Sequence, residues 1–149
     1  MSASEKTPLK GRVSLIMYKN DDLRSSELLA LKPVGRWFNA TELSPSGQKA
    51  AWLIVQHGDP KIQKKVLPEL LIASKQGLVA SSDVAMLADR VEVAAGRPQI
   101  YGTQVVCIGS DPIFPDLLDP INVDKRREEV GLKGTFEEYK ARLLATNPC

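Results

Sequence analysis

Two proline-containing helix starts frame the segment that most constrains the fold. Ser44-Pro45 and Asp59-Pro60 each place a capping side chain directly before a proline, a residue that suits the first position of a helix. Residues 50–55 are apolar without interruption, which indicates a helix buried on nearly all sides. Gly58 is expected to end this helix, because glycine tolerates the left-handed cap conformation. The sequence therefore predicts two helices joined by a tight corner that contains His57.

Helical spacing of apolar residues recurs on both sides of this corner. A proline at position 68 is expected to kink or restart the second helix of the corner, which should end at Gln76-Gly77. Thr135 opens a capping box with Glu138, and so starts the last helix. The further helices expected are residues 23–31, 81–96 and 123–130. We therefore expect a mainly α fold, a single compact helical domain of about five helices.

The non-helical segments set the limits of this domain. Residues 105–108 favour a short strand, and a strand or hairpin near residues 104–114 is compatible with the helical fold. Prolines 112, 115 and 120 argue against a regular element over residues 111–120. Residues 1–12 are expected to form a flexible N-terminal tail, and residues 13–149 a single helical domain. The period of the apolar run 13–18 does not separate helix from strand.

Composition excludes several function classes. Twenty basic and eighteen acidic residues give a formal net charge of +2, too balanced to indicate nucleic acid or an anionic membrane as partner. No apolar run approaches the roughly 18 residues of a membrane span. Cys107 and Cys149 are too few for a disulfide framework or a zinc site, and we expect two free thiols. Free thiols suit a reducing compartment, so the expected location is cytoplasmic.

Several motifs carry a resemblance to a known family. They begin at Ala50–Asp59, return at Asp89-Arg90-Val91, and are strongest at Gly96–Gln104. They continue through Asp119-Pro120 and Val123–Leu132. In these motifs, over roughly Pro33 to the end, the chain resembles an uncharacterised, largely bacterial family of unknown function.

The resemblance implies a compact helical domain, and it brings no established activity with it. It marks as shared features His57, Asp59, Arg90, Tyr101 and Gln104. This chain departs from the family pattern in Pro68 and in a shorter, less regular N-terminal region, which puts helix geometry in doubt more than the polar residues.

His57 is the only histidine, so any imidazole-dependent step must use it. A histidine titrates near neutral pH, and Asp59 two residues later is placed to orient the ring for general acid–base chemistry. The alternative is structural: His57 caps the end of one helix and Asp59 caps the start of the next. The two roles are compatible.

The loop Gly96–Gln104 concentrates amides, a phenol and a hydroxyl around Gly102. Such a loop suits a polar substrate, but its side chains can equally satisfy the loop's own backbone. Asp89 is expected to bridge to another segment, with Arg90 directed into a pocket where its planar guanidinium binds an anion. A plain interhelical ion pair is the alternative.

We therefore expect a small cofactor-independent enzyme that acts on a polar or anionic small molecule by hydrolysis, elimination or isomerisation. The alternative is a non-catalytic ligand- or protein-binding regulatory domain. The expected catalytic residues are His57, Asp59 and Tyr101. The expected substrate-binding residues are Arg90, Gln99, Thr103, Gln104 and Arg127. No metal site is expected, because a second histidine or a pair of thiolates is lacking, and no nucleotide motif indicates a cofactor.

Overall fold

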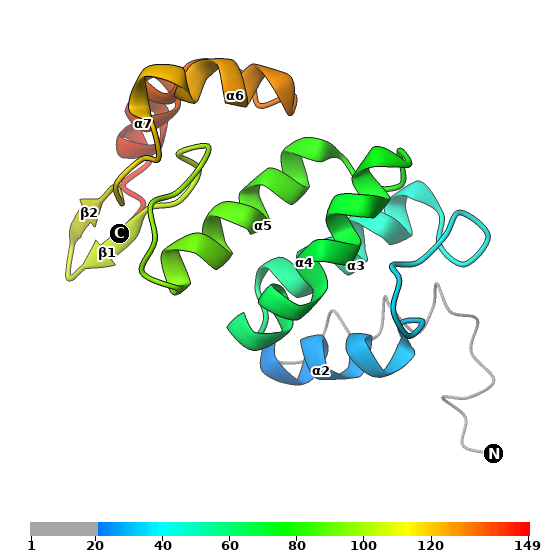
Figure 1. Ribbon diagram of the computed structural model, residues 1–149. Helices are drawn as coiled ribbons and strands as arrows, with labels where there is room; N and C mark the ends of the chain where they lie inside the picture. The colour runs from blue at the N-terminus through cyan, green and yellow to red at the C-terminus, as the bar shows by residue number, and fades with distance from the viewer. Residues whose placement is uncertain (1–20) are drawn as a thin grey trace. The chain divides into compact units, whose positions relative to one another are not determined.

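In the computed structural model, the part of the chain that the structure describes, residues 21–149, is mainly helical (Figure 1). Its α-helices are α2 (Asp21–Leu31), α3 (Pro45–Gln56), α4 (Pro60–Lys75), α5 (Ser81–Ala94), α6 (Val123–Glu129) and α7 (Phe136–Ala145). The short 3₁₀-helix η2 (Pro120–Asn122) precedes α6, and strands β1 (Val106–Ile108) and β2 (Asp111–Ile113) form a hairpin. The mainly α prediction is confirmed, and a hairpin occupies the segment near residues 104–114.

The fold divides between Ala80 and Ser81 into two compact units. The first contains α2, α3 and α4, which contact one another pairwise. The second contains α5, the hairpin, η2, α6 and α7. The single domain expected over residues 13–149 stays a prediction. The expected tail, residues 1–12, and the apolar run 13–18 lie outside the described residues.

The start of α3 follows the predicted capping chemistry. The Ser44 side chain accepts a hydrogen bond from the N–H of Gly47 at 3.2 Å, and Pro45 is the first helical residue. Trp52, Ile54 and Val55 are buried, as the apolar run indicated. The helix ends at Gln56, and His57 is its C-terminal cap. The local sequence therefore determines the start of α3.

The corner between α3 and α4 needs a glycine for a reason that the sequence did not reveal. The φ angle of Gly58 is not positive, so the prediction of a left-handed cap conformation at Gly58 is wrong. A Cβ atom at Gly58 would instead lie 2.4 Å from the Cβ of Ser25 on α2. The Ser25 hydroxyl accepts a hydrogen bond from the N–H of Asp59 at 3.2 Å. Close approach of α2 therefore requires the glycine.

Helix α4 begins and ends as predicted but does not restart at Pro68. The Asp59 side chain accepts from the N–H of Lys61 at 2.8 Å, and Gln76 caps the C-terminus ahead of Gly77, whose φ is +74°. Pro68 lies on the exposed side of one helix that continues to Lys75. Four apolar residues point to the core on the other side: Ile62, Val66, Leu70 and Ala73.

The hairpin of the second unit corrects the expectation that residues 111–120 contain no regular element. β1 and β2 pair antiparallel through a loop formed by Gly109 and Ser110, with Ile108 opposite Asp111 and Cys107 opposite Pro112. In a hairpin with so short a loop, the closing pair exchanges the backbone hydrogen bonds and the next pair does not. Pro112 therefore occupies a position where its missing N–H costs no pairing bond.

The C-terminal segment begins with the predicted capping box and ends in a disulfide. Thr135 accepts from the N–H of Glu138 at 3.1 Å, and the Glu138 carboxylate accepts from the N–H of Thr135 at 2.9 Å. After α7 the chain returns to β1, where Cys149 is bonded to Cys107. The prediction of two free thiols is therefore wrong, and the argument for a reducing compartment loses its basis. None of the helices in residues 21–149 combines the length and apolarity needed to cross a membrane.

Candidate functional site

His57 and Asp59 lie at the corner of the first unit, and both cap helices. The backbone N–H of His57 donates to the carbonyl of Leu53 at 3.1 Å, and the imidazole is exposed. The Asp59 carboxylate is half-buried and is engaged by the N–H of Lys61. This geometry agrees with the capping interpretation of both residues. The acid–base role of His57 and Asp59 stays a prediction.

The remaining predicted site residues lie in the second unit, where Asp89 of α5 holds the Gly96–Gln104 loop. Asp89 is fully buried. One carboxylate oxygen accepts from the backbone N–H groups of Ile100 at 2.6 Å and Tyr101 at 2.9 Å. The other accepts from the N–H of Thr103 at 2.9 Å and from its hydroxyl at 2.8 Å. Hydrogen bonds replace water around this charge, as burial of a carboxylate demands.

The buried side chain of Gln99 forms hydrogen bonds with backbone groups of the loop and of the segment after the hairpin. Its side chain is fully buried, and its amide oxygen accepts from the N–H of Gln104 at 2.9 Å. Its amide nitrogen donates to the carbonyl of Pro115 at 3.0 Å. The backbone of Gln99 also pairs with the segment after the hairpin, through the carbonyl of Asp116 at 2.9 Å and the N–H of Leu118 at 2.8 Å. The amide of Gln99 is therefore occupied by backbone groups of the protein itself.

Two adjacent arginines of α6 hold the loop from the other side. Arg127 is 1% exposed and donates to the carbonyls of Tyr101 at 2.8 Å and Gly134 at 3.1 Å. Arg126 donates to the carbonyl of Ile100 at 2.9 Å and also to that of Leu118. Burial lowers the pKa of Arg127, but a guanidinium stays protonated at neutral pH. Both guanidinium groups thus donate hydrogen bonds to backbone carbonyl oxygens.

Helix α7 also contacts the Gly96–Gln104 loop. The Tyr139 hydroxyl donates to the carbonyl of Thr103 at 2.8 Å. Gly102, with a φ of +70°, lies so close to Phe136 that an added Cβ would meet its ring at 2.4 Å. Here the glycine is required both by its backbone conformation and by the neighbouring ring.

Tyr101 is the predicted proton donor of the loop, and its side chain is half-buried. Burial, followed by the negative charge of Asp89, raises the pKa of the Tyr101 phenol above its ordinary value. The phenol is therefore protonated at neutral pH. A catalytic role for Tyr101 stays a prediction.

Arg90 and Gln104 form the polar wall of a cleft on the second unit. The Arg90 Nε donates to the amide oxygen of Gln104 at 3.2 Å. The Gln104 amide nitrogen donates to the carbonyl of Met86 at 3.2 Å and to the Thr103 hydroxyl at 3.0 Å, which fixes the amide. The cleft has a volume of about 350 Å³, and its other walls are Val93, Ala94, Val105 and Val106. Burial lowers the pKa of Arg90, which remains a cation.

Among the predicted substrate-binding residues, the structure thus brings Arg90, Gln99, Thr103 and Gln104 into one hydrogen-bonded network around Asp89. Arg127 joins this network through the carbonyl of Tyr101. Their contacts favour the alternative in which the loop's polar side chains satisfy its own backbone. Substrate binding by Gln99, Thr103 and Arg127 stays a prediction.

Sequence reasoning missed the anchoring roles of Arg126 and Tyr139. Asp89 bridges to another segment as expected, but its partners are backbone N–H groups and a hydroxyl in place of a cation. The signal available was a helical carboxylate close in sequence to a loop rich in glycine and amides. Nothing local showed that its partners would be backbone N–H groups.

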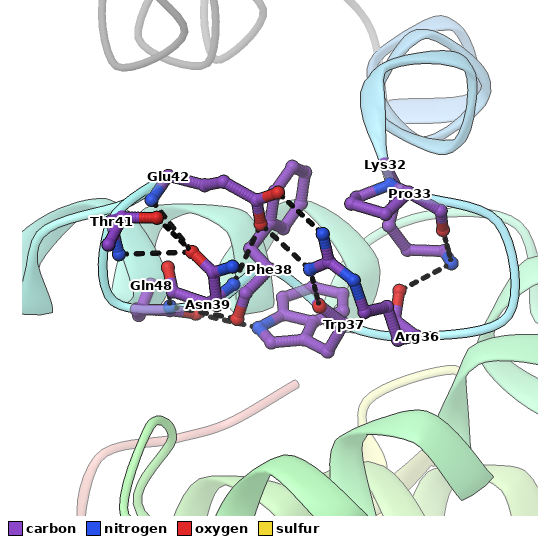
Figure 2. A network of polar contacts seen from close by, with 9 residues as sticks. All are labelled: Lys32, Pro33, Arg36, Trp37, Phe38, Asn39, Thr41, Glu42 and Gln48. Atoms are coloured by element: carbon purple, nitrogen blue, oxygen red, sulfur yellow. Dashed lines mark hydrogen bonds and ion pairs between the residues drawn. The ribbon is translucent and has the colours of Figure 1, made fainter.

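Figure 2 shows a second polar network, in the first unit, that the sequence did not reveal. The Lys32 ammonium donates to the carbonyls of Pro33 at 2.6 Å and Arg36 at 2.9 Å, and lies 2.6 Å from a carboxylate oxygen of Glu69 on α4. Arg36 forms two hydrogen bonds with Glu42, at 2.9 and 2.7 Å. These contacts fix the loop between α2 and α3.

The aromatic side of this network is buried. The Trp37 indole donates to the amide oxygen of Gln48 at 2.7 Å, and the Gln48 amide nitrogen donates to the carbonyl of Phe38 at 3.1 Å (Figure 2). A pocket of about 280 Å³ opens beside Trp37. It is lined by Gly35, Arg36, Trp37, Asn39, Glu69, Ile72, Ala73, Gln76 and Leu78. Within residues 21–149, no group of three or more His, Cys, Asp or Glu side chains is placed to hold a metal ion.

Comparison with known proteins identifies the family. Residues 21–147 match the model of a family of unknown function, DUF6624. The chain belongs to this family. The match to DUF6624 covers the helices of both units, the hairpin and the Gly96–Gln104 loop. No curated protein and no solved structure matches the chain. Membership in DUF6624 assigns no activity, so the function rests on the residues described above.

Proposed function

We propose that the chain is a ligand-binding domain whose second unit captures a small aliphatic carboxylate between Arg90 and Gln104. The observation that carries the proposal is the composition of the cleft: a guanidinium and an amide at one wall, aliphatic side chains at the others. A guanidinium carries a positive charge and planar N–H donors, a geometry that matches the two oxygens of a carboxylate. The volume of about 350 Å³ suits a small molecule.

The surrounding network supports binding because it prepares the cleft in advance. Gln104 is held by Met86 and Thr103, and Thr103 is held by Asp89. A wall fixed in this way loses little conformational entropy when a ligand arrives. The polar loop is thus a scaffold for the cleft, and the ligand contacts the residues at its edge.

Calorimetric titration with butyrate tests the proposal, with butanol as the uncharged control. A ligand of this size is expected to bind with a Kd on the order of 1 mM. Ala94→Glu places a carboxylate in the cleft from an exposed position of α5 and should abolish butyrate binding. Ala95→Glu is the matched control, since Ala95 is exposed beside the cleft but does not line it.

Equal binding of butyrate to both variants, or no binding to the unmodified chain, overturns the proposal. The acid–base prediction needs a separate assay, which follows turnover of polar small molecules. Turnover that His57→Asn abolishes, with the melting temperature nearly unchanged, would show an enzyme instead of a binding domain.

A further inference from the structure

The outer face of α4, in the first unit, is a continuous exposed stripe. Its members recur at three- and four-residue spacing, which places them on one side of a helix. They are Lys61, Lys64, Lys65, Pro68, Leu71, Ile72 and Lys75. The opposite side of α4 is buried and contacts α2 and α3. We refer to these seven residues as the α4 stripe.

The α4 stripe carries positive charge at both of its ends. It carries lysines at four of its seven positions, and none of them forms an ion pair with another residue in the described range 21–149. Glu69 is the acidic residue of α4; it lines the pocket together with Ile72, and its carboxylate is paired with Lys32 at 2.6 Å. A helix face with this charge attracts an acidic partner.

The α4 stripe also carries an apolar patch next to a pocket. Ile72 is 59% exposed and Leu71 is 45% exposed. Ile72, Ala73 and Leu78 form the apolar part of the pocket beside Trp37. Its volume of about 280 Å³ accommodates one bulky aliphatic side chain with room for its backbone. Exposed apolar groups with a charged rim are typical of protein-binding surfaces.

We propose that the α4 stripe and its pocket dock an acidic protein segment, with an aliphatic side chain seated at Ile72 and glutamates or aspartates facing the lysines. The pocket favours a peptide over a lipid surface or a nucleic acid, because neither presents an aliphatic side chain of this size on a backbone. The net charge of +2 adds no general attraction to polyanions. This proposal is independent of carboxylate binding at Arg90.

Fluorescence anisotropy with a labelled peptide tests the proposal. The probe contains glutamates on both sides of a leucine pair, and two control peptides replace either the glutamates by glutamine or the leucines by serine. The probe should bind saturably at low ionic strength, more weakly as salt is added, and more tightly than either control. Absence of saturable binding, or equal binding of the three peptides, overturns the proposal.

Two matched charge reversals locate the site. Lys64→Glu with Lys65→Glu should raise the Kd of the probe at least about tenfold. Lys125→Glu with Lys133→Glu makes the same change in net charge at exposed positions of the second unit and should leave the Kd nearly unchanged. Ile72→Ser should weaken binding of the leucine peptide and leave that of the serine peptide unchanged.

Equal effects of the two charge reversals would overturn the assignment of the site. Tighter binding of the unmodified chain to phosphatidylserine vesicles than to the probe would show a lipid surface as occupant and also overturn it. Circular dichroism melting of each variant confirms that the fold is retained.

Discussion

Both the backbone N–H and the hydroxyl of Thr103 donate to the same carboxylate oxygen of Asp89, at 2.9 and 2.8 Å. Thr103 is thereby fixed at main chain and side chain together. Its hydroxyl in turn accepts from the amide of Gln104 at 3.0 Å, which ties the wall of the cleft to the buried carboxylate. Asp89 thus links α5 to the residues proposed to contact ligand.

Asp89→Asn should lower the free energy of unfolding by about 3 kcal/mol, because an amide supplies one acceptor oxygen to a site built for two. Urea denaturation at neutral pH measures the loss. Asp116→Asn, at an exposed position whose backbone also contacts the loop, is the control and should change stability by less than about 0.5 kcal/mol. Equal effects of the two variants would contradict the anchoring role.

Gly102→Ala should destabilise the second unit more than Gly131→Ala. Both glycines have positive φ, +70° and +76°, so both variants incur the left-handed strain of about 1–2 kcal/mol. A Cβ at Gly102 also meets Phe136, whereas one at Gly131 meets nothing within 4 Å. The clash should add about 1–3 kcal/mol. Comparison of the two melting curves measures this addition, and coincident curves would show that Phe136 moves aside freely.

Glu42 should make the free energy of unfolding depend on pH in the acidic range. Hydrogen bonds from Arg36, and then from the N–H of Asn39, lower the pKa of Glu42 from 4.5 to about 2. The ionised form is therefore favoured by folding, and its contribution is complete above the unfolded pKa. It is lost as the pH falls from 4.5 towards 2.

Glu42→Gln tests this dependence. The pair is solvent-exposed, so its contribution to the free energy of unfolding at neutral pH is expected to be small. The difference in melting temperature between the unmodified chain and Glu42→Gln should shrink as the pH approaches 2. Glu128→Gln makes the same change in charge at an exposed position of α6 and is the matched control. A difference that grows in acid would reverse the expected sign.

The Cys107–Cys149 disulfide closes a loop between residues 42 positions apart, and its loss should cost up to about 4 kcal/mol. The double variant Cys107→Ser, Cys149→Ser should therefore melt at a lower temperature. Alkylation of the denatured chain should label no thiol before reduction and both after it. Labelling of both thiols without reduction would restore the free-thiol expectation.

The helix starts could be predicted from the sequence because N-terminal capping is local. Ser44, Asp59 and Thr135 each bond within the first turn of their own helix. The hairpin was only partly predictable: a strand was expected at residues 105–108, but Pro112 argued against the partner strand Asp111–Ile113. Mainly helical structure therefore followed from spacing and caps alone.

The roles that depended on distant contacts could not be predicted. Gly58 is required by Ser25 on another helix, and Cys149 meets Cys107 only because the chain turns back after α7. Asp89 gave no local sign that its partners would be backbone N–H groups. The polar side chains of the loop were identified from the sequence. Their hydrogen bonds with backbone groups depend on tertiary packing, which the sequence did not show.

The most direct test of carboxylate capture is an NMR titration that follows the Nε–H signal of Arg90 as butyrate is added. We predict a saturable shift of this signal in the unmodified chain and in Ala95→Glu, and none in Ala94→Glu. An Arg90 signal that stays unmoved while signals elsewhere in the protein respond would show that the carboxylate binds at another place, and would contradict the assignment of the cleft.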